Sequence, residues 1–196
     1  MMGMTCRRLS RAMPEQTQLH TERLLLRPFQ PGDVADALSY RNDEEFARFL
    51  PHIPQPFTKR DAEAFVARNM SEPWDTSPTF AVVLQGHVIG TVNLEVDART
   101  RTAMLGYAIG RAFWGRGIAS EAARAVVAWG MEAFGLVRVW ASTDARNVRS
   151  QRVLEKLGMR HEVIRTQDHA GRDGELVDEV VYGLDVTSTD QTTERA

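Results

Sequence analysis

Apolar residues follow two different spacings along the chain, and the change between them predicts its secondary structure. A short apolar run at 22–29, ended by proline, predicts a first strand, and the next apolar positions favour helices at 31–42, 43–50 and 59–70. From Pro78 the pattern alternates and predicts a hairpin at 79–97 that turns at 85–87, followed by a strand at 102–110. A long helix before 135, a strand at 136–144, a helix at 147–158 and two strands at 159–167 and 174–184 complete the series. The fold class predicted is α+β, with a mixed, mostly antiparallel sheet of six to seven strands flanked by helices.

The two ends lack this patterning. Residues 1–19 contain no continuous apolar segment of the kind found in signal peptides, and we expect a flexible leader there. Residues 187–196 are polar and predict a flexible tail. A single domain over 20–186 is expected between them, which suits a chain of 196 residues.

Composition narrows the function classes. The formal net charge of −2 provides no basic field that would draw the chain to nucleic acid or a membrane surface, and no apolar run reaches the length of a membrane span. The single cysteine, Cys6, excludes an internal disulfide framework and a cysteine metal cluster, which suits a reducing cytoplasm. The histidines have no metal-ligand spacing, so no metal site is expected.

The segment "GRAFWGRGIASE" at 110–121 lies between a predicted strand and a predicted helix. The first-turn amides of a helix have no partners within it and carry the positive end of its dipole. Gly115 and Gly117 lack Cβ atoms, so an anion can approach the main chain closely, and Arg116 adds a cation. A phosphate site and a tight strand–helix turn explain this pattern equally well. The Gly-Lys-Ser/Thr of a nucleotide triphosphate loop is absent, and four bulkier residues before Gly115 make a dinucleotide loop the weaker alternative.

The motifs "GYAIGRAFWGRGIASEA" and "GLVRVWASTDARNVRSQRVLEKLGMR" resemble the acetyl-CoA core of the GNAT superfamily of N-acetyltransferases. More narrowly, the chain from about 21 to 184 is similar to the ribosomal-protein alanine N-acetyltransferases. The resemblance implies that the main chain around the glycines holds the acetyl-CoA pyrophosphate, with the contact residues Trp114, Gly115, Arg116, Gly117, Ile118, Ala119 and Ser120. Trp114 departs from the Gln or Arg of the wider superfamily. The resemblance also implies that the strand ending at Ile109 splays from strand 136–143, with the pantetheine arm hydrogen-bonded to the main chain near Ile109.

Direct attack of an amine on acetyl-CoA in a ternary complex is the mechanism that the resemblance implies. An α-amino group has a pKa near ~8, against about 10.4 for lysine, so a protein N-terminus is the easier nucleophile at neutral pH. Asn147 stands at a predicted helix N-cap, and the resemblance adds a contact to the coenzyme arm. Ser150 is either an ordinary first-turn serine or, as the resemblance suggests, the donor to the leaving thiolate.

The catalytic base is the least defined part of the predicted site. Glu95 shares one strand face with Thr91 and Asn93, and it is either the acceptor of the amine proton or an exposed strand-end carboxylate. Met104 stands where many relatives of this branch carry a glutamate.

We therefore expect a cytoplasmic, acetyl-CoA-dependent N-acetyltransferase that acts on a protein N-terminal alanine-type amine or on a small-molecule amine. The alternatives are a non-catalytic acyl-CoA-binding module and, more weakly, a dinucleotide-binding protein. The acceptor and the formation of a homodimer are left open.

Overall fold

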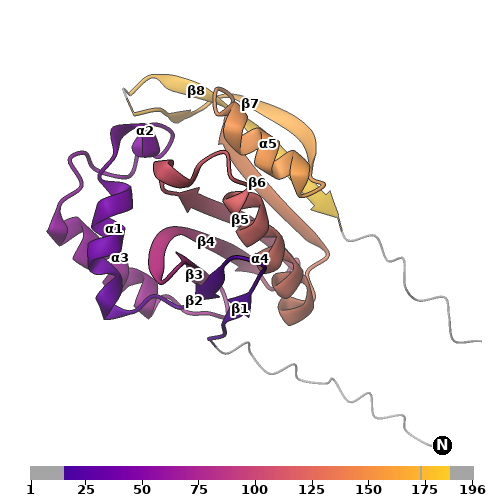
Figure 1. The fold of residues 1–196 in the computed structure, drawn as a ribbon. Coiled ribbons are helices and arrows are strands. Elements are labelled where there is room, and N and C mark those ends of the chain that lie inside the picture. The colour runs from indigo at the N-terminus through magenta and orange to yellow at the C-terminus, as the bar shows by residue number, and fades with distance from the viewer. Residues whose placement is uncertain (1–15, 173, 186–196) are drawn as a thin grey trace, which may run out of the picture.

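The structure, a computed structural model, describes residues 16–172 and 174–185 as one mixed α+β domain. Its N-terminal half runs through β1 (Leu19–His20), β2 (Leu25–Arg27), a 3-10 turn (Pro31–Asp33), α1 (Val34–Arg41), α2 (Glu44–Ala47), α3 (Lys59–Ser71), β3 (Thr79–Leu84) and β4 (His87–Asp97). The C-terminal half contains β5 (Thr102–Ile109), a 3-10 turn (Arg111–Phe113), α4 (Ile118–Phe134), β6 (Arg138–Asp144), α5 (Val148–Lys156), β7 (Arg160–Ala170) and β8 (Leu176–Asp185). Figure 1 shows the helices distributed around the sheet.

The sheet has the strand order β1-β2-β3-β4-β5-β6-β8-β7. All neighbouring strands are antiparallel except β5 and β6, which are parallel because α4 carries the chain between them. The fold class predicted from the sequence is confirmed, but the sheet has eight strands rather than six to seven. The additional strand is the two-residue β1, too short to give an alternating pattern, and it brings Leu19 from the expected leader into the sheet.

Two apolar clusters cover the two faces of the sheet. Helix α4 buries one face of small and branched residues, Ile118, Ala122, Ala123, Val126 and Val127, against strand residues that include Phe80, Val92 and Leu94. Helices α1 to α3 pack Tyr40, Phe46 and Phe65 against the opposite face, over Ala81, Val83 and Val88. Helix spacing and strand alternation therefore direct the apolar residues into two layers, one on each face of the sheet.

Local sequence signals set the helix boundaries. Thr58 caps α3 as predicted, since its hydroxyl accepts from Asp61 N while the Asp61 carboxylate accepts from Thr58 N. Gly158 lies just after α5 and has a φ of +83°. This left-handed conformation, common at helix C-termini, favours glycine. The expected leader up to residue 15 and the expected tail at 187–196 lie outside the described residues.

No helix within the described ranges is long and apolar enough to cross a membrane. In the same part of the chain, no three His, Cys, Asp or Glu side chains are grouped so as to hold a metal ion.

Candidate active site

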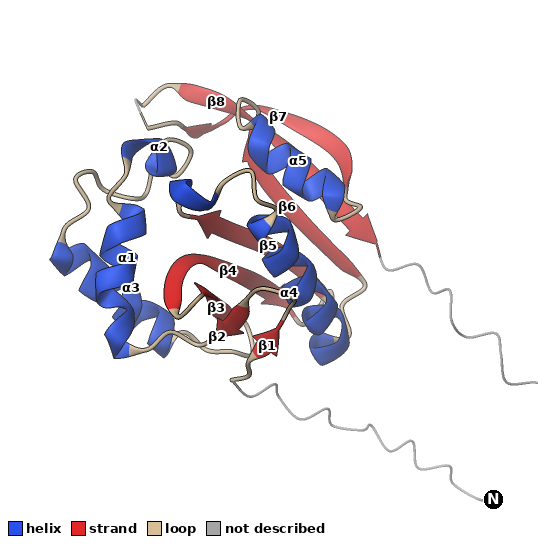
Figure 2. Ribbon diagram, viewed as in Figure 1, coloured by secondary structure: helices blue, strands red, loops and turns tan. Residues whose placement is uncertain are grey.

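The centre of the sheet opens where β5 and β6 diverge. The two strands pair with each other only over Thr102–Met104 and Arg138–Trp140. Along their whole lengths, the other edge of β5 pairs with β4 and the other edge of β6 pairs with β8. The divergence can be followed in Figure 2, where α4 and α5 lie alongside it. The expected splay between the strand ending at Ile109 and strand 136–143 is therefore present, and it begins after Met104. Main-chain groups on the facing edges of the two strands are left without a strand partner, which is the setting that allows an extended ligand to add as a strand.

The glycine segment forms the turn that leads from β5 into α4. Gly115 and Gly117 have φ of +72° and +77°, and both are exposed. Gly117 is the N-cap of α4. The first hydrogen bond of the helix runs from the Glu121 N–H to the Gly117 carbonyl, at 3.0 Å. The amides of Ile118, Ala119 and Ser120 precede it and so have no partner within the helix. These amides, with the helix dipole, form a site suited to an anion.

A polar clamp that sequence reasoning missed holds this turn in place. Arg23, from the segment between β1 and β2, donates from Nη1 to the Arg116 carbonyl at 2.9 Å and from Nε to Glu121 Oε2 at 2.7 Å. Glu121 Oε1 also accepts from the Thr21 hydroxyl and from Arg23 N. Although burial opposes it, these hydrogen bonds lower the pKa of Glu121 below its usual value. The clamp fixes the path of the turn and neutralises the carboxylate beside it.

Trp114 connects the glycine turn to the end of β5. Its indole Nε1 donates to the Ile109 carbonyl at 2.6 Å, and the Arg149 guanidinium lies 4.8 Å above its ring. The tryptophan thus fixes the distance between the anion-binding turn and the open edge of β5. This hydrogen bond uses one of the two acceptor positions of the Ile109 carbonyl oxygen. Ile109 is the residue expected to contact a ligand through its main chain.

Asn147 and Ser150 lie at the start of α5, across the split from β5. The Asn147 carboxamide accepts from Ser150 N at 3.2 Å, which confirms the predicted N-cap. The Ser150 hydroxyl lies 2.8 Å from the phenol oxygen of Tyr107, which belongs to β5 and also donates to the Ser150 carbonyl. Burial raises the pKa of Tyr107 to about 12, against the opposing effect of the Ser150 hydrogen bond. A neutral phenol from β5 and a hydroxyl from α5 are therefore hydrogen-bonded to each other across the split.

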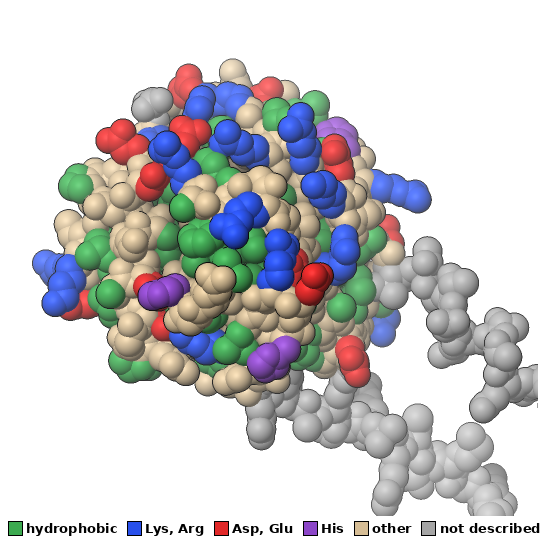
Figure 3. Space-filling view, viewed as in Figure 1, with side chains coloured by type: hydrophobic (Ala, Val, Ile, Leu, Met, Phe, Trp, Pro, Cys, Tyr) green, Lys and Arg blue, Asp and Glu red, His purple; other side chains and the backbone are tan. Residues whose placement is uncertain are grey.

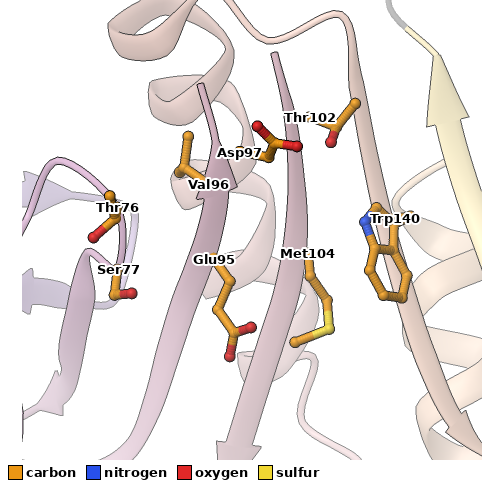
Figure 4. A pocket seen from close by; sticks show the side chains of 8 residues that line it. All are labelled: Thr76, Ser77, Glu95, Val96, Asp97, Thr102, Met104 and Trp140. Carbon is orange, nitrogen blue, oxygen red and sulfur yellow. The ribbon is translucent and has the colours of Figure 1, made fainter. Parts of the chain in front are cut away.

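Glu95 lies in an open cavity of about 420 Å³ on the sheet face opposite α4. It pairs across β4 and β5 with Met104, which in turn pairs with Trp140 of β6. Figure 4 shows these three side chains on adjacent strands, at the level where β5 and β6 separate. The rest of the lining is polar except for Val96: Thr76, Ser77, Val96, Asp97 and Thr102. The cavity therefore places the Glu95 carboxylate beside the apolar side chains of Met104 and Trp140.

A second hollow of about 430 Å³ lies beside the glycine turn, between the β1–β2 segment and the first turns of α4. Gly117, Ser120, Glu121 and Arg124 line it, so this side of the turn is reachable from the surface. In the space-filling view, Lys and Arg side chains gather on the face of the molecule where α4 and α5 lie (Figure 3). The exposed basic residues of these elements include Arg116, Arg149 and Arg152. An anionic ligand would meet a favourable local field here although the whole chain is slightly acidic.

The structure brings the predicted residues together in two groups. One group lies around the open end of the split, where β5 ends, and consists of Ile109, the turn 114–120, Asn147 and Ser150. Glu95 stands apart from it, on the other sheet face at the base of the split. Tyr107 was missed although it lies inside the quoted motif "GYAIG"; its position before the glycine turn was the available signal.

Comparison with known proteins gives the family. The model of the acetyltransferase (GNAT) domain matches residues 23–160. The chain belongs to the GNAT acetyltransferase family. It is 32% identical over 144 residues to the uncharacterized N-acetyltransferase YnaD of Bacillus subtilis, an alignment covering 72% of this chain and 82% of that protein. This GNAT chain is therefore an acetyltransferase.

Solved structures of other GNAT proteins have the same fold. An acetyltransferase of the family from Bacillus anthracis superimposes with a TM-score of 0.76 at 28% identity, covering 86% of this chain and 98% of that one. The ribosomal L7/L12 α-N-protein acetyltransferase RimL, solved in complex with coenzyme A, gives a TM-score of 0.78 at 18% identity over 87% of this chain and 98% of that one. At that identity the likeness to RimL shows the fold alone. The dinucleotide alternative loses its basis, because such folds need a parallel sheet and this sheet has one parallel pair.

Proposed function

We propose that the chain transfers an acetyl group from acetyl-CoA to a primary amine, either a protein N-terminus or a small-molecule amine, in a ternary complex. The observation that carries the proposal is the exposed glycine turn, with its unpaired amides, placed directly at the open edge of β5. Membership of the GNAT family and the coenzyme A complex of RimL support acetyl-CoA as the cosubstrate. The cytoplasm is the compartment that we propose for it.

In this proposal the main-chain N–H groups from Gly115 to Ser120 hold the diphosphate. The clamp of Arg23 on Glu121 supports that role, because an unpaired carboxylate beside the turn would repel an anion. The pantetheine arm follows the unpaired edge of β5 near Ile109 and passes Asn147. When bound, acetyl-CoA supplies a thioester whose carbonyl carbon accepts the amine nitrogen: a C–N bond forms, the C–S bond breaks, and coenzyme A leaves as its thiolate.

The residues of the chain stabilise the charges that develop in this reaction. The Ser150 hydroxyl donates a hydrogen bond to the thiolate. Tyr107 stays protonated across the physiological range because its pKa is about 12, and its hydrogen bonds to the Ser150 carbonyl and hydroxyl hold Ser150 in place. Glu95 accepts the proton lost by the amine, directly or through water, from the cavity at the base of the split. An N-terminal amine needs the least help from this base, because a fraction of it is already neutral near pH 7.

An acetyl-CoA turnover screen tests the proposal by reading released thiol over N-terminal peptides, polyamines and aminoglycosides. We expect thiol release with at least one acceptor class and a strong loss of turnover in Ser150→Ala. The alternative, a binding module without chemistry, predicts calorimetric binding of acetyl-CoA but no thiol release with any amine. Absence of acetyl-CoA binding would reject both.

A further inference from the structure

A carboxamide without a partner lies on the face of the sheet opposite α4. This face, called the acceptor face below, carries Thr91, Asn93 and Glu95 at alternate positions of β4. Thr91 is buried and lies 3.0 Å from the Tyr40 phenol oxygen, Asn93 is half-buried, and Glu95 is exposed. Within residues 16–172 and 174–185, the Asn93 carboxamide has no hydrogen-bond partner. Asn93 is therefore the first polar side chain of this row that a ligand can reach beyond the helical layer.

The Asn93 carboxamide extends from β4 across β5, toward the split. Asn93 pairs with Gly106 of β5, so the two side-chain positions share one face of the sheet. A Cβ added to Gly106 would lie 2.5 Å from Asn93 Oδ1 and 3.3 Å from Asn93 Nδ2. The carboxamide therefore occupies the space above Gly106, which a larger residue would fill. Because β5 pairs with β6 only as far as Met104, Gly106 lies on the open edge of its strand.

The carboxamide and the thiolate donor lie on opposite faces of the sheet. Gly106 and Tyr107 are successive residues of β5 and so face opposite sides. Tyr107 meets Ser150 on the side that α4 and α5 cover. A pantetheine arm that adds to β5 as a strand would lie about 4.8 Å from its main chain. Its thioester would then have Ser150 on one side for the leaving sulfur and Asn93 on the other side for the incoming amine.

A carboxamide offers two kinds of hydrogen bond at once. Its oxygen accepts and its nitrogen donates. An α-amino carbonyl compound, such as an amino acid amide or the first residue of a peptide, carries the complementary pair: an amine N–H that donates, and a carbonyl oxygen on the adjoining carbon that accepts. A simple alkylamine has only the first of these groups. An N–H bonded to the carboxamide oxygen also leaves the lone pair of a neutral amine free for attack.

We propose that Asn93 is the specificity-determining residue for the acceptor: its Oδ1 accepts from the amine, and its Nδ2 donates to the carbonyl oxygen beside the amine-bearing carbon. The inference rests on the proposed function and names its acceptor class, the α-amino carbonyl compounds. Glu95 lies two residues farther along the same face, about 7 Å by strand geometry, which one water can bridge to receive the amine proton.

NMR of the nitrogen-15-labelled full chain, with coenzyme A bound, tests the contact without turnover. The side-chain NH2 resonances of Asn93 are those that disappear in Asn93→Asp. We expect titration with alaninamide to shift them saturably. The matched ligand is 2-aminopropane, in which a methyl group replaces the carboxamide of alaninamide, and it should shift them much less. Asn93 resonances that alaninamide leaves in place would overturn the inference.

Turnover with the same two amines measures the preference itself. The amines differ in pKa, but this difference cancels when the ratio of their kcat/KM values in a variant is divided by the ratio in the natural chain. We expect Asn93→Asp, which keeps the accepting oxygen and loses the donor, to reduce the preference for alaninamide about tenfold or more, and Asn93→Ala to do the same. An unchanged ratio in both variants would overturn the inference.

Gly106→Ala tests the contact from β5, because its Cβ displaces the Asn93 carboxamide. It should reduce the same preference, whereas Gly32→Ala, where no atom lies within 4 Å of an added Cβ, should keep it. The Kd of acetyl-CoA should be unchanged in Asn93→Asp; a large rise would assign Asn93 to the coenzyme and overturn the inference.

Two further outcomes separate this inference from the proposed function. Thiol release with polyamines or aminoglycosides but not with alaninamide would overturn the inference and leave the acetyltransferase proposal standing. If no amine releases thiol, the proposed function fails instead, and the NMR titration decides the role of Asn93 separately.

Discussion

Replacement of Gly117 by alanine separates the role of the glycine turn in binding from its role in folding. Gly117 has φ of +77°, where an L-residue costs about 1–2 kcal/mol. An added Cβ would meet only Arg23 Nη2, at an ordinary 3.6 Å, so the cost comes from the backbone and not from a clash. For a domain of this size we expect the Tm to fall by about 2–8 °C.

The effect on acetyl-CoA binding should exceed this general loss. Relaxation of φ toward negative values would turn the following amides away from the diphosphate. Loss of one hydrogen bond to a charged group corresponds to about 1.5–3 kcal/mol, so the Kd measured by calorimetry should rise about 10- to 100-fold.

Gly158→Ala is the matched control for this prediction. Gly158 has φ of +83° with no atom within 4 Å of an added Cβ, and it follows α5 rather than the glycine turn. It should lose a similar amount of stability and keep its affinity. If both variants lose similar stability and both bind acetyl-CoA as the natural chain does, the assignment of the diphosphate to this turn is refuted.

Further predictions concern the groups around the split. Ser150→Ala, by removing the donor, and Tyr107→Phe, by releasing Ser150, should each lower kcat by about 10- to 100-fold with little change in the Kd of acetyl-CoA, measured by stopped-flow turnover and calorimetry; unchanged kcat in both would remove Ser150 and Tyr107 from the mechanism. Arg23→Met should weaken acetyl-CoA binding about 3- to 10-fold by releasing the turn, and Glu121→Gln should restore part of this loss, so additive effects of the two changes would contradict the clamp. The folded pKa of Glu121 is lowered, so its stabilisation is present above its unfolded pKa and is lost as pH falls through the folded value; Glu121→Gln should therefore flatten the acid limb of a Tm-against-pH curve, and an unaltered limb would count against the clamp.

The sequence predicted most of the elements because their signals are local. The turn at 85–87, the cap at Thr58 and the cap at Asn147 each depend on residues a few positions apart, and the structure confirms them. The strand β1 was missed because two residues give no periodicity, and it is held by pairing with β2.

The missed parts of the site depend on contacts between distant residues. Arg23 and Glu121 are 98 residues apart, and Tyr107 meets Ser150 across 43. Neither pairing can be read from spacing, because the approach of the segments depends on how β1, α4 and α5 pack around the split.

A crystal structure of the chain with coenzyme A tests the central claim most directly. The account predicts the diphosphate oxygens at hydrogen-bond distance from the main-chain N–H groups of 115–120, with the pantetheine arm between β5 and β6. A coenzyme whose diphosphate lies away from this turn, or whose arm avoids the split, would contradict it.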